Sequence, residues 1–432
     1  MKRTLLFVIT QFYRGGAETA LVNLLKALSP EDYAVDLLVL NQTTQENSLL
    51  PEVPAWVRVL DAGAENGAKP FSMTKKAFWL GGDAALRFVA GRTYDAAFSY
   101  GEWCPLEFVA QNVAARTKAV WIHTDITKSN GFDANAFFDS FLSYRYYIFV
   151  SEDTKRRAEA RYPFLIGKSA LIHNVLDRAW LEKQAAQPVK DFAYPVWGLH
   201  LITVANVRTE KGYPRMLETA KALKARKVEF TWLCVGAQPD AALLERLKRE
   251  IAQSGLNGQM ILLGPRANPY PYMRAAQVFV LLSDYEAWPL AMAEAMMLGR
   301  PAVATRTSGA CTHVVDGQNG LLCDFSAESA ADALQRCAED ENLMRTIRCG
   351  AARFDPAPEA LREFFSSGSV GRSPPTAWGR LHGKRTPFEP PRPDLPGGSG
   401  RPVPEGCIEI QSFVPLKAPH LILSYFANGD QR

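Results

Sequence analysis

The sequence predicts an α/β protein with two domains, each built on a mainly parallel sheet covered by helices. The chain has 432 residues, whereas a single domain usually has roughly 100–200. Short apolar runs alternate with segments in which apolar residues recur every three or four positions, a pattern typical of buried parallel strands joined by helices. Two such series are separated by a polar, proline-containing linker at residues 184–196.

Composition narrows the class of function. Hydrophobic residues make up 47% of the chain, enough for large cores, and the net charge of +4 is too small to predict a nucleic-acid partner. The seven cysteines are scattered without a C-x-x-C pair, which favours a reducing cytoplasm over a disulfide scaffold or a zinc site. No apolar run approaches the roughly 18–20 residues of a membrane span. The short N-terminal run is interpreted as a strand, not as a signal peptide.

In the first series, glycines and a histidine stand where strands end. Gly15 and Gly16 follow the first strand and precede a helix, so backbone can approach a ligand closely there. His123 follows the strand at 118–122, on the edge of the sheet where ligands bind. The strands are expected at 4–10, 35–40, 94–99, 118–122 and 146–150, the helices at 77–90 and 107–115, and a loop at 63–73.

In the second series, two carboxylates flank a strand-to-helix turn. Glu286 follows the strand at 278–282, Pro289 is suited to the first turn of the next helix, and Glu294 lies inside that helix. Open α/β sheets bind phosphorylated ligands where a strand end leads into a helix N-terminus. Carboxylates there are suited to the hydroxyl groups of a sugar or a ribose. Further strands are expected at 199–205, 230–236, 261–264 and 301–305.

The segment SDYEAWPLAMAEAMMLGRPAVAT resembles the E-x7-E motif of the retaining glycosyltransferases of family 4, which have the GT-B fold. The resemblance implies two Rossmann-like domains facing each other across a cleft. It also implies that Glu286 and the backbone after it, with Pro289 and Leu290, contact the donor sugar, and that Glu294 binds the ribose. The turn at 316–322, D-G-Q-N-G-L-L, also resembles the family and is interpreted as a hairpin signal.

The same resemblance implies roles for further residues. Lys211 and the glycine after it resemble the R-x4-K-G element, in which the arginine and the lysine clamp the donor diphosphate. In this chain Asn206 occupies the position of the family's arginine. Arg208 lies two residues further along the chain. A lysine, an arginine and helix N–H groups can stabilise a departing diphosphate without a metal, so no metal or cofactor is expected. The loop with Arg266 resembles the one that reads the base. The GGAE loop with Gly15 and Gly16 resembles a loop at the interdomain cleft, and His123 takes a place near the donor sugar.

The resemblance covers roughly residues 4–365 and is strongest over 262–322. It implies an acceptor domain at 1–183 and a nucleotide-sugar domain at 197–365. The remaining tail, 366–432, matches nothing: proline and glycine make up about four in ten of residues 366–406, a composition that predicts disorder. A natural low-complexity extension and a frameshift near residue 365 both account for it.

The expected function is transfer of a sugar from a nucleotide-sugar donor to a glycan, lipid-linked or polysaccharide acceptor, in cell-envelope polysaccharide biosynthesis. The expected location is the cytoplasm or the inner membrane face. The aromatic and basic segment 137–145 fits either a membrane contact or, preferably, a buried helix face. A GT-B sugar-nucleotide epimerase and a non-catalytic nucleotide-sugar-binding protein remain alternatives. A Rossmann oxidoreductase is disfavoured because no G-x-G-x-x-G follows the first strand.

Overall fold

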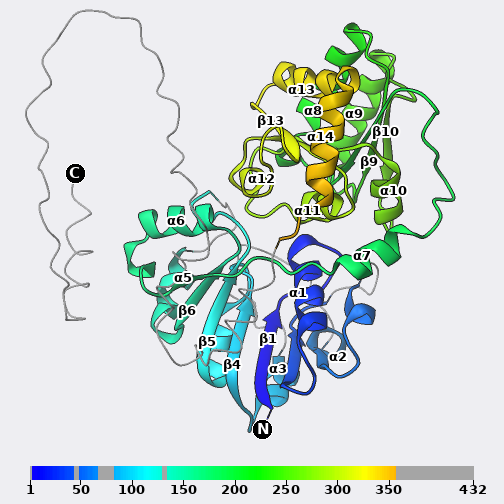
Figure 1. Ribbon diagram of the computed structural model, residues 1–432. Coiled ribbons are helices and arrows are strands. Elements are labelled where there is room, and N and C mark those ends of the chain that lie inside the picture. Colours follow the sequence, from blue (N-terminus) through cyan, green and yellow to red (C-terminus); the bar gives the residue numbers. More distant parts are fainter. Residues whose placement is uncertain (1, 43–47, 67–81, 129–133, 357–432) are drawn as a thin grey trace, which may run out of the picture. The chain divides into compact units, whose positions relative to one another are not determined.

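The structure is a computed structural model, and it describes residues 2–42, 48–66, 82–128 and 134–356. Two parallel sheets with flanking helices make up this part of the chain (Figure 1). The tail for which the sequence predicts disorder, residues 366–432, lies outside the described residues.

The first sheet has seven strands in the order β3-β2-β1-β4-β5-β6-β7, and every neighbouring pair is parallel. Its helices lie between successive strands, as parallel pairing requires, except for the last helix, which follows β7. The strands are β1 (Arg3–Ile9), β2 (Tyr33–Val39), β3 (Arg58–Asp61), β4 (Thr93–Tyr100), β5 (Ala114–Ile122), β6 (Tyr146–Phe149) and β7 (Ser169–Leu171). The helices are α1 (Gly16–Ala27), α2 (Ala62–Asn66), α3 (Gly82–Val89), α4 (Leu106–Asn112), α5 (Ala134–Ser140), α6 (Glu152–Arg161) and α7 (Arg178–Ala185), with the 3-10 turns η1 (Leu50–Glu52), η2 (Phe141–Ser143) and η3 (Pro163–Leu165).

The second sheet has six strands in the order β10-β9-β8-β11-β12-β13, again all parallel. The strands are β8 (Leu199–Val204), β9 (Phe230–Val235), β10 (Met260–Gly264), β11 (Val278–Leu281), β12 (Ala302–Thr305) and β13 (Gly320–Cys323). The helices are α8 (Tyr213–Ala225), α9 (Ala241–Gln253), α10 (Tyr270–Ala275), α11 (Leu290–Met297), α12 (Ser308–His313), α13 (Ala327–Glu339) and α14 (Glu341–Ala352), with the 3-10 turn η4 (Thr209–Lys211).

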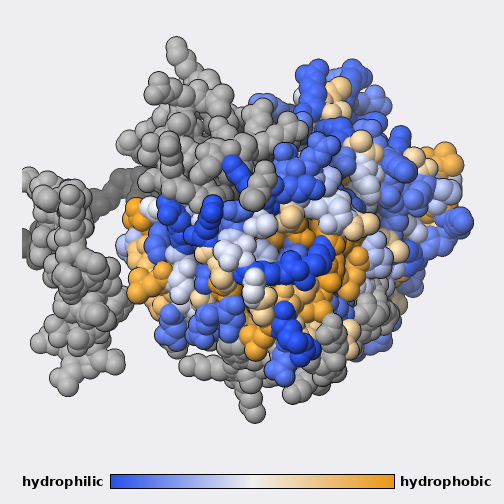
Figure 2. Space-filling view, turned by 90° about the horizontal axis from the view of Figure 1, so that it is seen from below, coloured by the Kyte–Doolittle hydropathy of each residue, from blue (hydrophilic) through white to orange (hydrophobic). Residues whose placement is uncertain are grey.

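Both sheets are buried on both faces, which explains why their strands are continuous apolar runs. In β1, Phe7 belongs to one core cluster and Val8 to the cluster on the opposite face. In β11, Val280 and Phe279 divide between two clusters in the same way. On the face seen in Figure 2, hydrophobic residues gather among hydrophilic ones.

The ten strands expected from apolar runs are confirmed within about one residue at most ends, although β5 begins earlier than expected. The hairpin interpretation of residues 316–322 is wrong: β13 follows α12 and pairs parallel with β12. The predicted helix at 107–115 ends early, because Ala114 already begins β5. The loop at 63–73 begins inside α2, and its remainder from residue 67 is not described. Of the helix at 77–90, the described part is α3.

Helix α7 begins before the predicted linker, ends two residues into it, and packs with the second sheet. Its residues Leu181 and Ala185 belong to the core cluster that contains Phe279 of β11, and α7 contacts α10. Asp177 caps its N-terminus by accepting a hydrogen bond from the backbone N–H of Trp180 at 3.0 Å. The division at residues 184–196 itself stays a prediction.

Candidate active site

The loop after β8 is pressed against the end of β11. Gly212, which follows η4, has φ +74°, and a Cβ atom added to it would lie 1.8 Å from the carbonyl oxygen of Leu282. The backbone N–H of Asp284 also donates to the carbonyl of Glu210 at 2.9 Å. Only glycine fits this close approach in a left-handed conformation, and the result is that Lys211 lies beside the loop that carries Glu286.

Lys211 and Glu286 form an ion pair. The Nζ of Lys211 lies 2.8 Å from Oε1 of Glu286, and the Oγ of Ser283 donates to the same oxygen at 2.8 Å. The Glu286 side chain is 11% exposed and that of Lys211 30%. Because an ammonium group has three donors, Lys211 can hold Glu286 and still bind a phosphate oxygen. The second oxygen of Glu286 remains able to accept from a sugar hydroxyl.

The N-terminus of α12 holds the Glu286 loop in place. The backbone N–H of Gly309 donates to the carbonyl of Glu286 at 2.9 Å, and the Oγ of Ser308 donates to the same carbonyl at 3.2 Å. A Cβ atom added to Gly309 would lie 2.7 Å from Cδ of Pro289 and 2.8 Å from the Glu286 carbonyl oxygen. The backbone from Glu286 to Pro289 is therefore fixed before any ligand binds.

Glu294 is buried in α11, which begins after Pro289 with Leu290 as its first residue. The phenol of Tyr270, from α10, donates to Oε1 of Glu294 at 3.0 Å. Burial raises the pKa of Glu294 to about 8, since desolvation disfavours the charged form. At neutral pH this group is a carboxylic acid, which can donate as well as accept a hydrogen bond.

The two candidate arginines have different surroundings. The Arg208 side chain is 53% exposed, and it pairs with Glu210, with Nη1 3.8 Å from Oε1. Arg266 pairs with Asp191 of the linker at 2.6 Å and donates to the carbonyls of Leu263 and Pro265. Arg266 therefore fixes the linker on its own loop, whereas Arg208 is available at the loop of Lys211.

His123 follows β5 as predicted, but its surroundings keep it uncharged. Its Nε2 is buried without a hydrogen-bond partner among the described residues, and its ring lies 4.7 Å from that of Tyr100 and 5.8 Å from that of Trp103. Burial lowers the pKa of His123 to about 3. The imidazole is thus neutral at physiological pH, whatever its role.

Glu102 and Glu18 are acids at this edge that were not among the predicted site residues. Glu102 is buried after β4 and accepts from the backbone N–H of His123 at 2.9 Å, and burial raises its pKa. The Glu18 carboxylate lies over Gly15, because a Cβ added there would be 2.4 Å from Oε2, and burial raises the pKa of Glu18 to about 7. A Cβ at Gly16 would meet nothing within 4 Å. An acid directly after a strand end was the available signal for Glu102.

Solved structures with this arrangement define the fold as GT-B. The structure of HepE from Anabaena in complex with UDP and glucose superposes with a TM-score of 0.63 at 19% identity, covering 84% of this chain and 100% of that one. Sucrose-phosphate synthase from Thermosynechococcus elongatus gives a TM-score of 0.63 at 18% identity, over 85% and 96% of the two chains.

The second sheet and its helices carry the sequence relationship. Residues 198–353 match the model of the family described as glycosyl transferases group 1. N-acetyl-alpha-D-glucosaminyl L-malate synthase from Bacillus anthracis is 25% identical over 46% of this chain and 50% of that protein. The lipopolysaccharide core biosynthesis glycosyltransferase LpsE from Rhizobium meliloti is 27% identical over 39% and 44%. The chain thus spans about half the length, or less, of these curated relatives.

Proposed function

We propose that this chain is a retaining glycosyltransferase that moves a sugar from a nucleotide-sugar donor to an acceptor hydroxyl. The observation that carries the proposal is the Lys211–Glu286 pair, held at 2.8 Å on the carboxyl edge of the second sheet. It lies inside the segment that matches the group 1 family, 198–353. The fold it shares with HepE, whose structure contains UDP and glucose, supports a nucleotide-sugar donor.

In this proposal the second sheet binds the donor. Lys211, with Arg208, neutralises the diphosphate as the bond to the sugar breaks, and the N–H groups at the start of α8 add to that stabilisation. Glu286 accepts hydrogen bonds from sugar hydroxyls through Oε2, while Ser283 and Lys211 bind its Oε1. Glu294, with Tyr270 against it, binds the ribose. The leaving phosphate takes the proton of the acceptor hydroxyl.

The first sheet binds the acceptor in the same proposal. A neutral His123 lies near the donor sugar, as the family resemblance implies, and the acids Glu18 and Glu102, whose pKa values are raised by burial, can hydrogen-bond the hydroxyls of a glycan. Relatives named for lipopolysaccharide core biosynthesis support a lipid-linked or polysaccharide acceptor of the cell envelope. We place the reaction in the cytoplasm, where the six described cysteines stay free.

Donor binding and acceptor-dependent turnover test this function together. Nucleoside diphosphates and their sugars are screened by thermal shift on the full chain, since a ligand of the folded state raises its melting temperature. Glycan acceptors are then added with the stabilising donor, and released nucleoside diphosphate is measured. Release that requires an acceptor is expected. Conversion of the donor into its epimer without an acceptor would instead identify the epimerase.

A non-catalytic nucleotide-sugar-binding protein is the second candidate, and Asn206 favours it. This residue stands where the resembled family has its second cation, and its Oδ1 accepts from the backbone N–H of Ala237 at 3.2 Å. Thr312 stands near the place where the resembled family usually has a glutamate, and it donates to the Ser308 carbonyl at 3.0 Å. Donor stabilisation without product over a panel of acceptors would support this candidate against transfer.

We further propose peripheral contact with the inner membrane face through an exposed apolar patch. Within the described residues no helix is both long and apolar enough to cross a bilayer. In segment 137–145 the rings of Phe137 and Tyr144 are buried, as a helix face would be, but Leu142 is 89% exposed and Phe138 40%. Ile166, 67% exposed, lies two residues from Phe164, whose ring is 4.9 Å from that of Phe138.

The membrane proposal is tested with anionic vesicles. Exposed Arg145, three residues after Leu142 in the chain, suits anionic headgroups, while Leu142 and Ile166 suit the acyl boundary. Co-sedimentation of the wild-type chain is expected, with loss of binding in Leu142→Asp. A matched control is Val315→Asp, because Val315 is 46% exposed on the second half of the chain. Equal binding of both variants would contradict the patch.

A further inference from the structure

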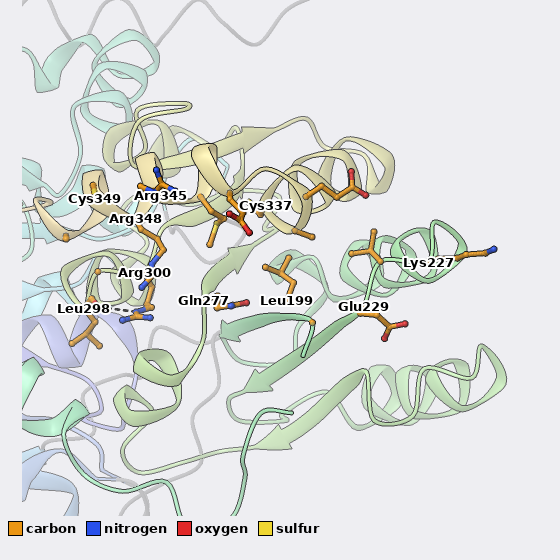
Figure 3. A pocket seen from close by; sticks show the side chains of 18 residues that line it. Leu199, Lys227, Glu229, Gln277, Leu298, Arg300, Cys337, Arg345, Arg348 and Cys349 are labelled. Carbon is orange, nitrogen blue, oxygen red and sulfur yellow. Dashed lines mark hydrogen bonds between the residues drawn. The ribbon is translucent and has the colours of Figure 1, made fainter. Parts of the chain in front are cut away.

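A large cavity lies at the amino-terminal edge of the second sheet, away from the carboxyl edge that carries Lys211 and Glu286. Its volume is about 1020 Å³. The starts of β8 and β9, the residues just before β11 and β12, and helix α14 form its walls (Figure 3). Nothing in the proposed transfer reaction uses this cavity.

One end of the cavity is cationic. Arg300, Arg345 and Arg348 line it, and Figure 3 shows them grouped at the end opposite Lys227 and Glu229. Arg300 is half-buried and held in place, because it donates to the carbonyls of Ala276 at 3.0 Å and Leu298 at 3.2 Å. A fixed guanidinium is ready to bind an anion without first losing side-chain freedom.

These arginines lack acidic partners in the described part of the chain. No carboxylate there lies within 4.0 Å of Arg300, Arg345 or Arg348, although the cavity wall includes Glu229, Glu339 and Glu341. Desolvation, with the charges of Arg348 and Arg274 nearby, lowers the pKa of Arg300. Neighbouring like charges around a half-buried guanidinium are unfavourable until an anion joins them.

Apolar side chains also line the cavity. They are Leu199, Val228, Leu298 and Met344, and Figure 3 shows Leu298 at the end that carries the arginines. The cavity volume is at the upper end of the usual size for small-molecule sites, roughly 300–1,000 Å³. A bare inorganic ion would leave most of this wall uncovered, whereas an organic anion would cover the apolar wall and reach the guanidinium groups together.

We propose that this cavity binds a small organic phosphate, with the phosphate on Arg300 and Arg348 and the organic part against Leu199 and Met344. A phosphate presents oxygens on several sides, so two guanidinium groups can bind it at once. The site is separate from the donor site and does not depend on the proposed glycosyl transfer.

Thermal shift on the full chain tests the proposal with phenyl phosphate, inorganic phosphate and phenol as probes. Phenyl phosphate is expected to raise the melting temperature by about 2–4 °C at a tenfold excess over its dissociation constant. Inorganic phosphate is expected to give a smaller rise, because it leaves the apolar wall uncovered. A rise with phenol equal to that with phenyl phosphate would overturn the proposal.

Variants locate the binding site. The double variant Arg300→Gln, Arg348→Gln is expected to abolish the rise in melting temperature with phenyl phosphate. Arg348→Gln alone is expected to reduce this rise at least threefold. Arg348 is exposed, so this single change should not disturb the fold. Lys227→Gln, at the far end of the same cavity, and Lys211→Gln, in the donor site, are expected to keep it. A rise that survives the double variant but disappears in Lys211→Gln would place the anion in the donor site and overturn the proposal, as would no rise in the wild type.

Discussion

The carboxyl edges of the two sheets share a topology but differ in electrostatics. At the second sheet, Lys211 and Glu286 are paired at 2.8 Å and remain partly exposed. At the first sheet, His123 is neutral and the pKa values of Glu18 and Glu102 are raised by burial. Parallel strand order therefore places loops together at an edge, and the side chains on those loops decide whether the edge suits a diphosphate or uncharged hydroxyl groups.

Substitution of Gly212 should have the largest effect on stability and turnover. Gly212→Ala puts a Cβ atom on the Leu282 carbonyl, at φ +74°, so the loop of Lys211 must move. We expect a loss of about 3 kcal/mol or more in the free energy of unfolding, measured by urea titration, together with loss of turnover.

The matched control is Gly258→Ala. Gly258 has φ +83°, but a Cβ there meets nothing within 4 Å, so only the left-handed conformation is penalised. Its loss should be about 1–2 kcal/mol. Equal losses in the two variants would show that the contact with Leu282 does not position the Lys211 loop.

Removing either side chain of the Lys211–Glu286 pair should have the next largest effect, a loss of turnover. Lys211→Ala and Glu286→Ala are each expected to reduce turnover tens-fold or more, because each removes a charged contact at a preorganised site. The double variant should lose much less than the product of the two effects, since the residues act together. Lys221→Ala, in the exposed pair with Glu218, is the control and should keep wild-type kcat/KM.

Glu294 should make stability depend on pH. Its pKa is about 8 in the folded chain, against 4.5 as the ordinary value, so the folded state holds one more proton between these limits. Stability from this group is fully present below pH 4.5 and falls by up to about 1.4 kcal/mol per unit as pH rises toward 8. Glu294→Gln should flatten the pH profile of urea unfolding over that window. An unchanged slope would mean that Glu294 is already ionised.

His123 should give the sharpest contrast with the second sheet. With a pKa of about 3, its ring should show no protonation by NMR between pH 8 and 5. Because the unfolded chain takes up this proton first, stability from the neutral ring is present above pH 6.5 and is lost as pH falls toward 3. A titration midpoint near 6.5 would contradict its burial and make the two edges more alike.

The sequence alone determined the alternating plan and most strands, because a parallel strand buried on both faces must be apolar throughout. It also placed Lys211, Glu286 and His123 at strand ends, since parallel strands bring such loops to one edge. It missed β3 and β7, which have four and three residues and show no period of their own.

Only the tertiary structure decided the partners of these residues. Tyr270 against Glu294, Ser283 against Glu286 and Asp191 against Arg266 are contacts between separate elements. The tertiary structure also decided that β13 pairs parallel with β12, whereas the local turn pattern had predicted a hairpin. The charge state of Glu294 and His123 follows from how completely their neighbours exclude water. The local sequence determines which ionisable side chains are present, whereas packing between distant segments determines how far water is excluded from them.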